Sequence, residues 1–277
     1  MTYWWISLLA SACCFAQWSG PPFPPESAQL KPADLKEILG LLCPGREYIG
    51  QESGCHVCPQ QTTNAGNQTD STIESAILGH FVDAKSDDML LVLYGCSPHA
   101  GDFRDAFLFT HSTTGWFVSQ ASELPVGRCR KIQNREGRDS LVCFTDHMMS
   151  GESTARLVFS YLPRQSSVEL AAAFDNTGMA CEDPRRMVVQ SAIQQVSFLP
   201  GTGGKLTLRI LARCRRGPLS ARSRKACAAG PGFEDIGPAL PFRAFRIDYN
   251  FNGETFSLAP VSRASKQAYE ACSSEGK

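Results

Sequence analysis

The sequence has no excess of charge of either sign, and this absence removes several classes of protein. Lys plus Arg and Asp plus Glu both number 27, so the formal net charge is zero. Proteins that bind nucleic acid or anionic membranes through their overall charge carry a clear basic excess. We therefore expect no nucleic-acid partner, and the charge balance by itself identifies no other partner.

Long apolar segments are also missing. The N-terminal apolar stretch, residues 1–16, is shorter than the roughly 20 residues that cross a bilayer, and no later segment reaches that length without charges. No transmembrane segment is expected. The stretch lacks Lys and Arg, but a polar, proline-rich segment follows it from Gln17, which favours a secretory signal peptide over the alternative of a buried strand.

Motifs of known hydrolases are absent as well, since no string of the HExxH or GxSxG type occurs. Histidines and aspartates near expected turns could form a metal or acid–base cluster. Polar residues in β-turns usually bond their own backbone, however, so a non-catalytic protein without cofactor or metal is the favoured interpretation. The side chains concerned are His80, His99, His111, His147, Asp83, Asp102 and Asp146.

Cysteine, by contrast, is plentiful, with 12 residues in the chain. Cleavage after Ala16 would leave an even number, which in an exported chain favours disulfides. We therefore expect a secreted or periplasmic protein. The segment that ends at Cys13 also resembles the cleavage motif of a lipoprotein, with Cys13 as the lipid-modified residue.

The most suggestive short motif is the CxxC formed by Cys55 and Cys58. Such a dithiol can be redox active at the start of a helix, but turn residues precede this one and no helical pattern follows Pro59. A zinc site would need a second pair of ligands, and no second CxxC occurs. A structural Cys55–Cys58 disulfide is the favoured interpretation, and a thiol–disulfide enzyme is the alternative.

The expected organisation has four parts. After the signal peptide, residues 17–32 are rich in proline and form a tether. Residues 33–74 form a cysteine-rich segment that contains one short helix, and residues 75–277 form a β-meander domain. The helix is predicted by the helical spacing of four apolar residues: Leu35, Ile38, Leu39 and Leu42.

Short β-rich runs separated by turns fill the remaining chain in three sets of four, and the first two sets repeat at about 50 residues, as propeller blades do. The sequence thus predicts an all-β fold of antiparallel four-stranded meanders, arranged as a propeller or as a curved sandwich or barrel. The expected strands are Ile77–Phe81, Met89–Tyr94, Ala106–His111, Trp116–Gln120, Cys129–Gln133, Ser140–Thr145, Ala155–Leu162, Val168–Phe174, Met187–Leu199, Leu206–Ala212, Phe242–Asn250 and Thr255–Ala259.

One hairpin of this meander predicts a disulfide. If the turn centres on Glu136, Cys129 lies directly opposite Cys143 on the neighbouring strand. Opposed residues of antiparallel strands lie roughly 4.5–5.5 Å apart at Cα, within reach of a disulfide. We therefore expect a Cys129–Cys143 bond.

Residues 213–240 interrupt the third set and lack periodicity, so we expect a surface loop there. Cys214 and Cys227 are the expected disulfide partners within it. The basic side chains around them could bind an acidic polysaccharide or a phosphate surface, although most such runs are simply solvated. These candidate binding residues are Arg213, Arg215, Arg216, Arg222, Arg224 and Lys225.

Two stretches, residues 79–90 and 134–142, run from a turn into a strand that begins with Asp and hydrophobic residues. Both resemble the FG-GAP (VCBS-like) repeat of integrin α-type β-propellers. The resemblance implies a propeller fold whose loops, of the type D-x-N-x-D-G, hold calcium. The matching residues are Gly79, Phe81, Asp87, Asp88, Asn134, Gly137, Asp139, Leu141 and Val142.

Both loops depart from the family at the calcium ligands. His80, Val82 and Ala84 stand where the first loop would supply oxygen atoms, and Ile132 replaces the leading aspartate of the second loop. Calcium takes six or more oxygen ligands, so neither loop is expected to bind it tightly.

These observations favour an exported, non-catalytic binding or structural domain, with the cell envelope as one location and an extracellular protein or a glycan as the partner. The ligand is not identified. The alternatives are a secreted hydrolase, a thiol–disulfide protein, and an envelope protein that associates with itself.

Overall fold

The structure is a computed structural model, and it describes most of the chain beyond the expected signal peptide. Cys13, Cys58, Cys96, His99 and Asp102 lie outside the described residues. The residues that the structure describes are 27–43, 47–48, 53–56, 71–94, 104–124, 128–149, 152–162, 166–183, 185, 187–200, 206–229 and 236–274.

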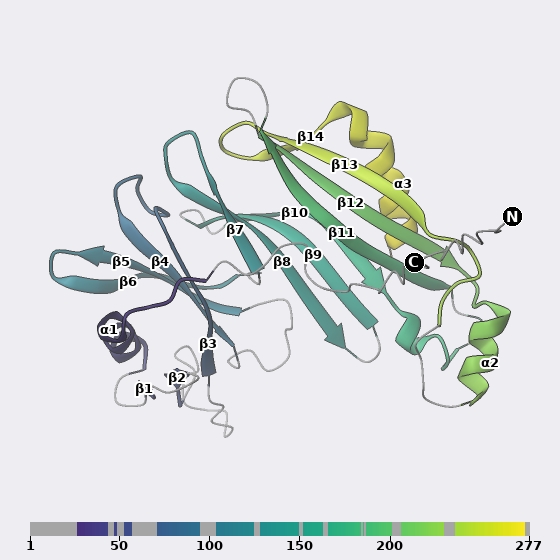
Figure 1. Ribbon diagram of the computed structural model, residues 1–277, viewed down its shortest axis with the longest axis horizontal. Coiled ribbons are helices and arrows are strands. Elements are labelled where there is room, and N and C mark those ends of the chain that lie inside the picture. Colours follow the sequence, from purple (N-terminus) through teal and green to yellow (C-terminus); the bar gives the residue numbers. More distant parts are fainter. Residues whose placement is uncertain are drawn as a thin grey trace, which may run out of the picture.

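Two antiparallel sheets, each a meander in chain order, form most of the molecule (Figure 1). The first, sheet A, has six strands: β1 (Glu47–Tyr48), β2 (Gly54–Cys55), β3 (Ser71–Gly79), β4 (Asp87–Tyr94), β5 (Arg104–Ser112) and β6 (Gly115–Leu124). The second, sheet B, has eight: β7 (Arg128–Gln133), β8 (Asp139–Met149), β9 (Glu152–Tyr161), β10 (Ser166–Asp175), β11 (Val188–Pro200), β12 (Leu206–Gly217), β13 (Arg243–Phe251) and β14 (Phe256–Leu258).

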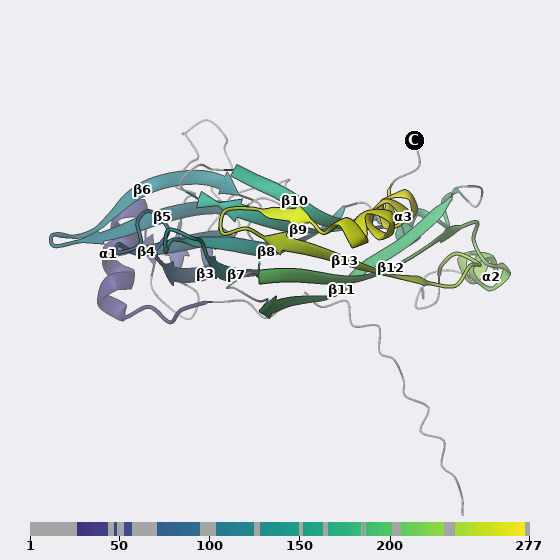
Figure 2. The same ribbon diagram turned by 90° about the horizontal axis from the view of Figure 1, so that it is seen from above.

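Few helices accompany the sheets. Figures 1 and 2 show α1 and α2 toward opposite ends of the long axis of the molecule, and α3 beside sheet B. The described helices are α1 (Pro32–Leu42), α2 (Ala221–Ala229) and α3 (Arg263–Ser273), with short 3-10 turns at Thr177–Met179 and Pro260–Ser262. No helix in the described part of the chain is both long enough and apolar enough to cross a membrane.

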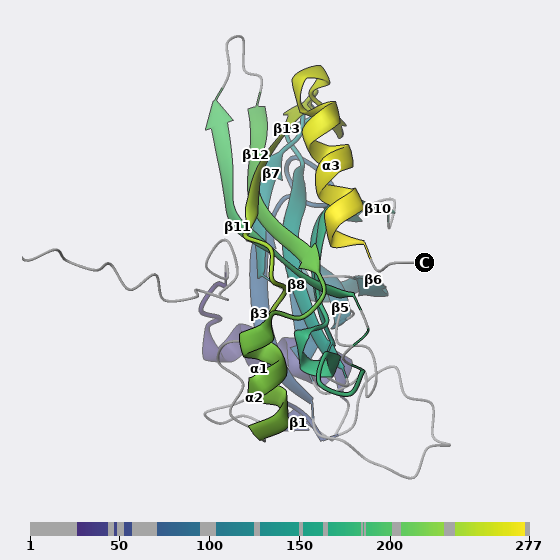
Figure 3. The same ribbon diagram turned by 90° about the vertical axis from the view of Figure 1, so that its right-hand side faces the viewer.

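The predicted all-β fold of antiparallel meanders with a short N-terminal helix is confirmed. The strands do not divide into four-stranded blades, however. Asp175 of β10 pairs with Gln190 of β11, so the second and third expected sets belong to one continuous sheet. That sheet curves around α3, which matches the curved alternative (Figures 1 and 3).

The N-terminal helix forms where its spacing predicts. Pro32 occupies the first turn, where its missing N–H leaves no hydrogen bond unmade, and the helix ends at Cys43, whose N–H donates to Leu39 O. Ile38 and Leu39 are fully buried against one face of sheet A. The last residues of the expected tether, residues 17–32, are attached to sheet A, since Ala28 N–H donates to Ala76 O of β3 at 2.7 Å.

The other face of sheet A packs against sheet B. Leu90 and Leu108 of sheet A share a buried cluster with Cys129, Leu141 and Cys143 of sheet B. Both faces of sheet A are therefore buried, one under α1 and one under sheet B.

Helix α3 covers the inner face of sheet B, and the sequence did not predict it. Tyr269 of this helix is buried, and the helix packs on β10 to β13. Cys272 is bonded to Cys214 of β12, and Arg216 Nη1 donates to Ala271 O at 3.0 Å near the C-terminal end of the helix. A guanidinium at this end satisfies carbonyls that have no partner within the helix.

The described residues contain four disulfides, which favour an oxidising compartment. The predicted Cys129–Cys143 bond is confirmed, with the two residues directly opposed and Cα atoms 3.9 Å apart. The predicted Cys55–Cys58 bond is wrong, because Cys55 pairs with Cys43 at the end of α1.

The predicted Cys214–Cys227 bond is also wrong. Cys214 points to the inner face of sheet B, toward α3, and pairs with Cys272. Cys227 lies on α2, in a separate buried cluster, and pairs with Cys181. Alternation along β12 decides this outcome, because it places Cys214 on the face away from α2.

The surface loop expected at 213–240 is replaced in large part by regular structure. β12 continues to Gly217 because both of its neighbours still pair with it at Cys214 or beyond. α2 then follows Ser220, whose hydroxyl accepts a hydrogen bond from Ser223 N–H at 2.9 Å, as a helix N-cap does. The glycine- and proline-rich composition concealed this cap.

Candidate binding surface

The outer face of β11, β12 and β13, opposite α3, is polar. Along β12, Leu208, Ile210 and Ala212 are buried in the core, so the alternate side chains point outward. Arg209, Arg213 and Arg215 are among them, and Arg246 lies on the same face of β13, opposite Leu211. We call these four arginines the arginine face.

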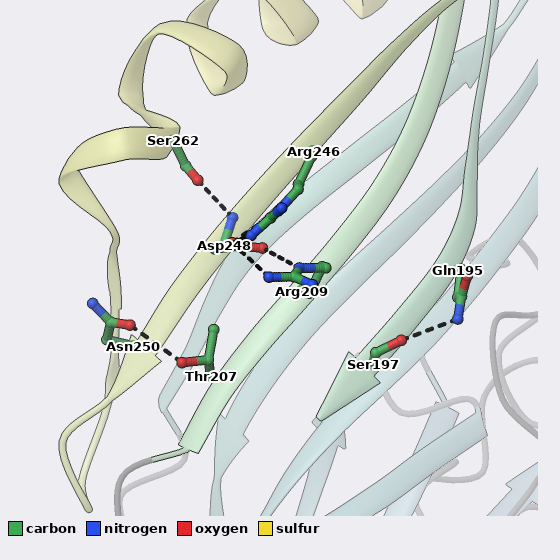
Figure 4. Close-up of polar contacts among 8 residues, drawn as sticks. All are labelled: Gln195, Ser197, Thr207, Arg209, Arg246, Asp248, Asn250 and Ser262. Carbon is green, nitrogen blue, oxygen red and sulfur yellow. Dashed lines mark hydrogen bonds and ion pairs between the residues drawn. The ribbon is translucent and has the colours of Figure 1, made fainter. Parts of the chain in front are cut away.

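An ion triad occupies one end of the arginine face (Figure 4). Arg209 donates to both carboxylate oxygens of Asp248, from Nε at 2.9 Å and from Nη2 at 3.3 Å. Arg246 donates to Asp248 Oδ2 from Nη2 at 2.8 Å. The N–H of Asp248 donates to Ser262 Oγ at 2.8 Å, which ties the triad to the turn before α3.

The triad keeps Asp248 ionised. Burial disfavours its charged form, but hydrogen bonds from Arg209 and then Arg246 outweigh the burial and lower the pKa of Asp248. Asp248 is the single acidic residue in these three strands. Among the described residues of these strands, four arginines thus share the outer face with one aspartate.

The other end of the arginine face contains an aromatic ring between two cations. Arg213 and Arg215 each hold their guanidinium 4.4 Å from the ring centroid of Phe242, a cation–π distance. Arg215 Nε also donates to Gln190 Oε1 at 2.7 Å. Among the described residues, Arg213 Nε is buried without a hydrogen-bond acceptor. The ring of Phe242 thus fixes the guanidinium of Arg213 in position.

Only two of the candidate binding residues from the sequence lie on this face, namely Arg213 and Arg215. Arg216 points to the opposite face and donates to the end of α3. Arg222, Arg224 and Lys225 lie on α2, where Arg224 Nη1 donates to Leu219 O at 2.8 Å.

Sequence reasoning missed Arg209 and Arg246. The first lies outside the basic run and the second is on another strand, and only the register of β12 and β13 brings them together. The signal available in the sequence was the alternation of basic and apolar residues from Arg209 onward, which would have extended the expected strand through residues 213–217.

Of the candidate histidines, the structure describes the surroundings of His80 and His111. His80 and His111 line a shared hollow with Trp116, but the Nδ1 of His80 donates to Ser86 O at 2.5 Å and so braces its own loop. Asp83 accepts a hydrogen bond from Lys85 N–H at 3.0 Å. No group of three or more His, Cys, Asp or Glu residues in the described part could hold a metal.

The two loops that resemble calcium-binding repeats lie side by side. His80 N–H donates to Asp139 Oδ2 at 2.9 Å, and Asp139 N–H donates to His80 O at 2.8 Å. Asp88 Oδ2 accepts a hydrogen bond from Val82 N–H at 2.7 Å, and Asn134 Oδ1 accepts one from Arg138 N–H at 2.9 Å. These oxygens therefore hold the turns in shape.

Comparison with known proteins adds no family. No protein-family model matches the sequence, and no curated protein is similar to it. Function is therefore inferred from the arrangement of the side chains, above all from the arginine face.

Proposed function

We propose that this protein is an exported, non-catalytic binding protein that holds an acidic polysaccharide on its arginine face. The observation that carries the proposal is the concentration of four arginines, with a single aspartate in the same three strands, on one sheet face of a chain whose net charge is zero. The guanidinium groups are positioned by Asp248 and Phe242 before any ligand arrives. Such preorganisation reduces the entropy that is lost on binding.

Arginine favours ligands that carry carboxylate or sulfate groups. Its planar guanidinium donates two parallel hydrogen bonds to such groups, which lysine cannot do. Arg209 and Arg215 are six residues apart on β12, a span of about 20 Å along an extended strand. A strip of this length suits several successive acidic groups of an extended chain.

A polysaccharide fits this face better than a membrane does. Among the described residues, none of the large apolar side chains that are strongly exposed belongs to β11, β12 or β13. Binding to a bilayer surface is much strengthened by several apolar side chains that insert between the lipids, and these three strands offer none, although the exposed Leu240 lies next to Gly217 at the end of β12. The disulfides favour an oxidising compartment, outside the cytosol, where acidic polysaccharides occur.

The test is calorimetric titration of the protein with polygalacturonate and with neutral dextran. We expect the polyanion to bind and dextran not to bind. The double substitution Arg213→Ala, Arg215→Ala should weaken binding at least about 10-fold, because even one charge-assisted hydrogen bond contributes roughly 1.5–3 kcal/mol. Binding should also weaken in concentrated salt, which screens exposed charges.

A charge-matched control is available on α2. The double substitution Arg222→Ala, Lys225→Ala removes the same charge from exposed positions away from the arginine face, and it should leave the affinity within about threefold. If both double variants lost the same affinity for polygalacturonate, binding would not be specific to the arginine face. Binding to vesicles that contain phosphatidylglycerol, without binding to polygalacturonate, would contradict the polysaccharide.

A further inference from the structure

A small cavity of about 220 Å³ lies at the open end of the inner face of sheet B. It is lined by Phe159, Tyr161 and Val168 and by six polar residues: Asn134, Glu136, Arg138, Ser166, Glu254 and Thr255. We call the turns that contain Glu136, Arg138 and Glu254 its rim. The arginine face is on the opposite side of the sheet. The cavity is therefore a separate feature, and a ligand in it would not depend on the proposed function.

One side of the cavity is apolar because the core reaches the surface here. Val168 and Phe159 are opposed on β10 and β9, and both point to the inner face. Phe159 packs edge-on against Phe256, with ring centroids 5.3 Å apart, so the wall is rigid. Val168 is 47% exposed although it is on the face that forms the core elsewhere. An exposed apolar side chain in a concave site is a contact for a ligand.

The rim is built from two turns that are tied together. Arg135 N–H donates to Gly253 O at 2.8 Å, and Arg135 Nη2 donates to Asn252 O at 2.7 Å. Gly137 and Gly253 adopt positive φ angles of 81° and 97°, which glycine allows without strain. The turn after β7 and the turn after β13 thus form one fixed rim.

The rim carries no net positive charge. Arg138 forms an ion pair with Glu136, and its guanidinium lies 5.5 Å from the ring centroid of Tyr161. Glu254 is the other acidic group on the rim, so the three charged groups sum to one negative charge. This arrangement disfavours anionic ligands, in contrast to the arginine face.

We infer that the cavity binds a single neutral pyranose ring. A pyranose has an apolar C–H face that packs on Tyr161 and Val168, and hydroxyl groups that donate to the carboxylates of Glu136 and Glu254. The volume is smaller than the roughly 300 Å³ at which pockets for drug-sized ligands begin, which suits one ring.

Saturation-transfer NMR and calorimetry on the full chain test this inference. The probes are the methyl glycosides of glucose, galactose and N-acetylglucosamine, with glucuronate as the anionic probe and glucosamine as the cationic probe. We expect at least one neutral glycoside to bind, in the millimolar range typical of one ring. Val168→Gln fills the cavity from an exposed position and should weaken that binding by at least about tenfold.

Two further variants keep the test decisive. Tyr161→Ala removes the aromatic wall and should cause a similar loss, with thermal unfolding to show that the fold persists. Thr113→Ala, in the exposed turn between β5 and β6, should bind as the unmodified protein does.

Three outcomes would overturn the inference: no neutral glycoside binds, Val168→Gln binds as tightly as the unmodified protein, or only glucuronate or glucosamine binds. Polygalacturonate binding should be unchanged by Val168→Gln, so failure of this site is distinguishable from failure of the arginine face.

Discussion

Strands β4 and β12 illustrate how differently the two sheets use their side chains. In β4, all six residues from Asp88 to Leu93 are buried, because α1 covers one face of sheet A and sheet B covers the other. In β12, buried and half-buried residues alternate, because α3 covers only the inner face.

The difference shows where this molecule can carry a binding surface. Sheet A is buried on both sides along β4. Sheet B leaves one face to solvent, and that face bears the arginines. Three predictions test this contrast, beginning with the largest effect.

A charged side chain placed in the middle of a strand should prevent folding in sheet A and should be tolerated in sheet B. Leu91 of β4 is fully buried among apolar side chains, so Leu91→Glu should prevent folding, since an unpaired buried carboxylate costs more than the whole stability of many domains. Leu211 of β12 is half-buried on the outer face and lies opposite Arg246. Leu211→Glu should change the free energy of unfolding by less than about 1 kcal/mol.

Soluble yield and urea unfolding measure both variants. A folded Leu91→Glu protein would show that sheet A is not enclosed as described. Leu211→Glu should also weaken polygalacturonate binding, because it adds a negative charge to the arginine face.

The disulfide that closes the longer loop should stabilise the fold more. Cys214–Cys272, which fastens α3 to sheet B, spans 58 residues, and Cys43–Cys55, which fastens α1 to sheet A, spans 12. Loop-closure entropy predicts a loss of about 4 kcal/mol when the first pair becomes alanine and about 3 kcal/mol for the second. Urea unfolding of the two double variants tests the order, and a larger loss for the shorter loop would contradict it.

The smallest predicted effect concerns alkaline pH. Burial raises the pKa of Tyr269 to about 12, with Ser191 and Ser273 opposing the rise. In the unfolded chain the tyrosine hydroxyl loses its proton near pH 10, whereas in the folded protein it keeps the proton up to about pH 12. The contribution of Tyr269 to the free energy of unfolding is therefore complete below pH 10 and decreases by roughly 2 kcal/mol as the pH rises toward 12. Tyr269→Phe should remove this dependence. Unfolding curves of both proteins between pH 9 and 11.5 measure the difference, and parallel curves would contradict it.

The sequence predicted the parts of the fold that depend on near neighbours. Apolar spacing located α1, alternation located most strands, and the symmetry of one hairpin identified the Cys129–Cys143 bond. The sequence did not predict α3 because its segment is mostly polar, with Tyr269 as its one large apolar side chain that is fully buried. Its place is set by a disulfide and by the curvature of sheet B.

The candidate sites depended much less on local pattern. The basic run was expected to form one loop, yet strand alternation sends Arg215 outward and Arg216 inward, and α2 removes the other basic residues from the face. The cavity joins β9 and β10 to two turns more than a hundred residues apart, at Arg138 and Glu254.

What local sequence settles, then, is the kind of element that each segment forms, because hydrogen bonding and side-chain alternation act between close neighbours. Which faces meet is settled by the packing of the whole chain. Arg209 and Arg246 share a surface only through the register of β12 and β13, and Cys214 finds Cys272 only because sheet B curves around α3. Contacts across such separations have no period in the sequence, since many arrangements satisfy the same local pattern and only the packed core selects one.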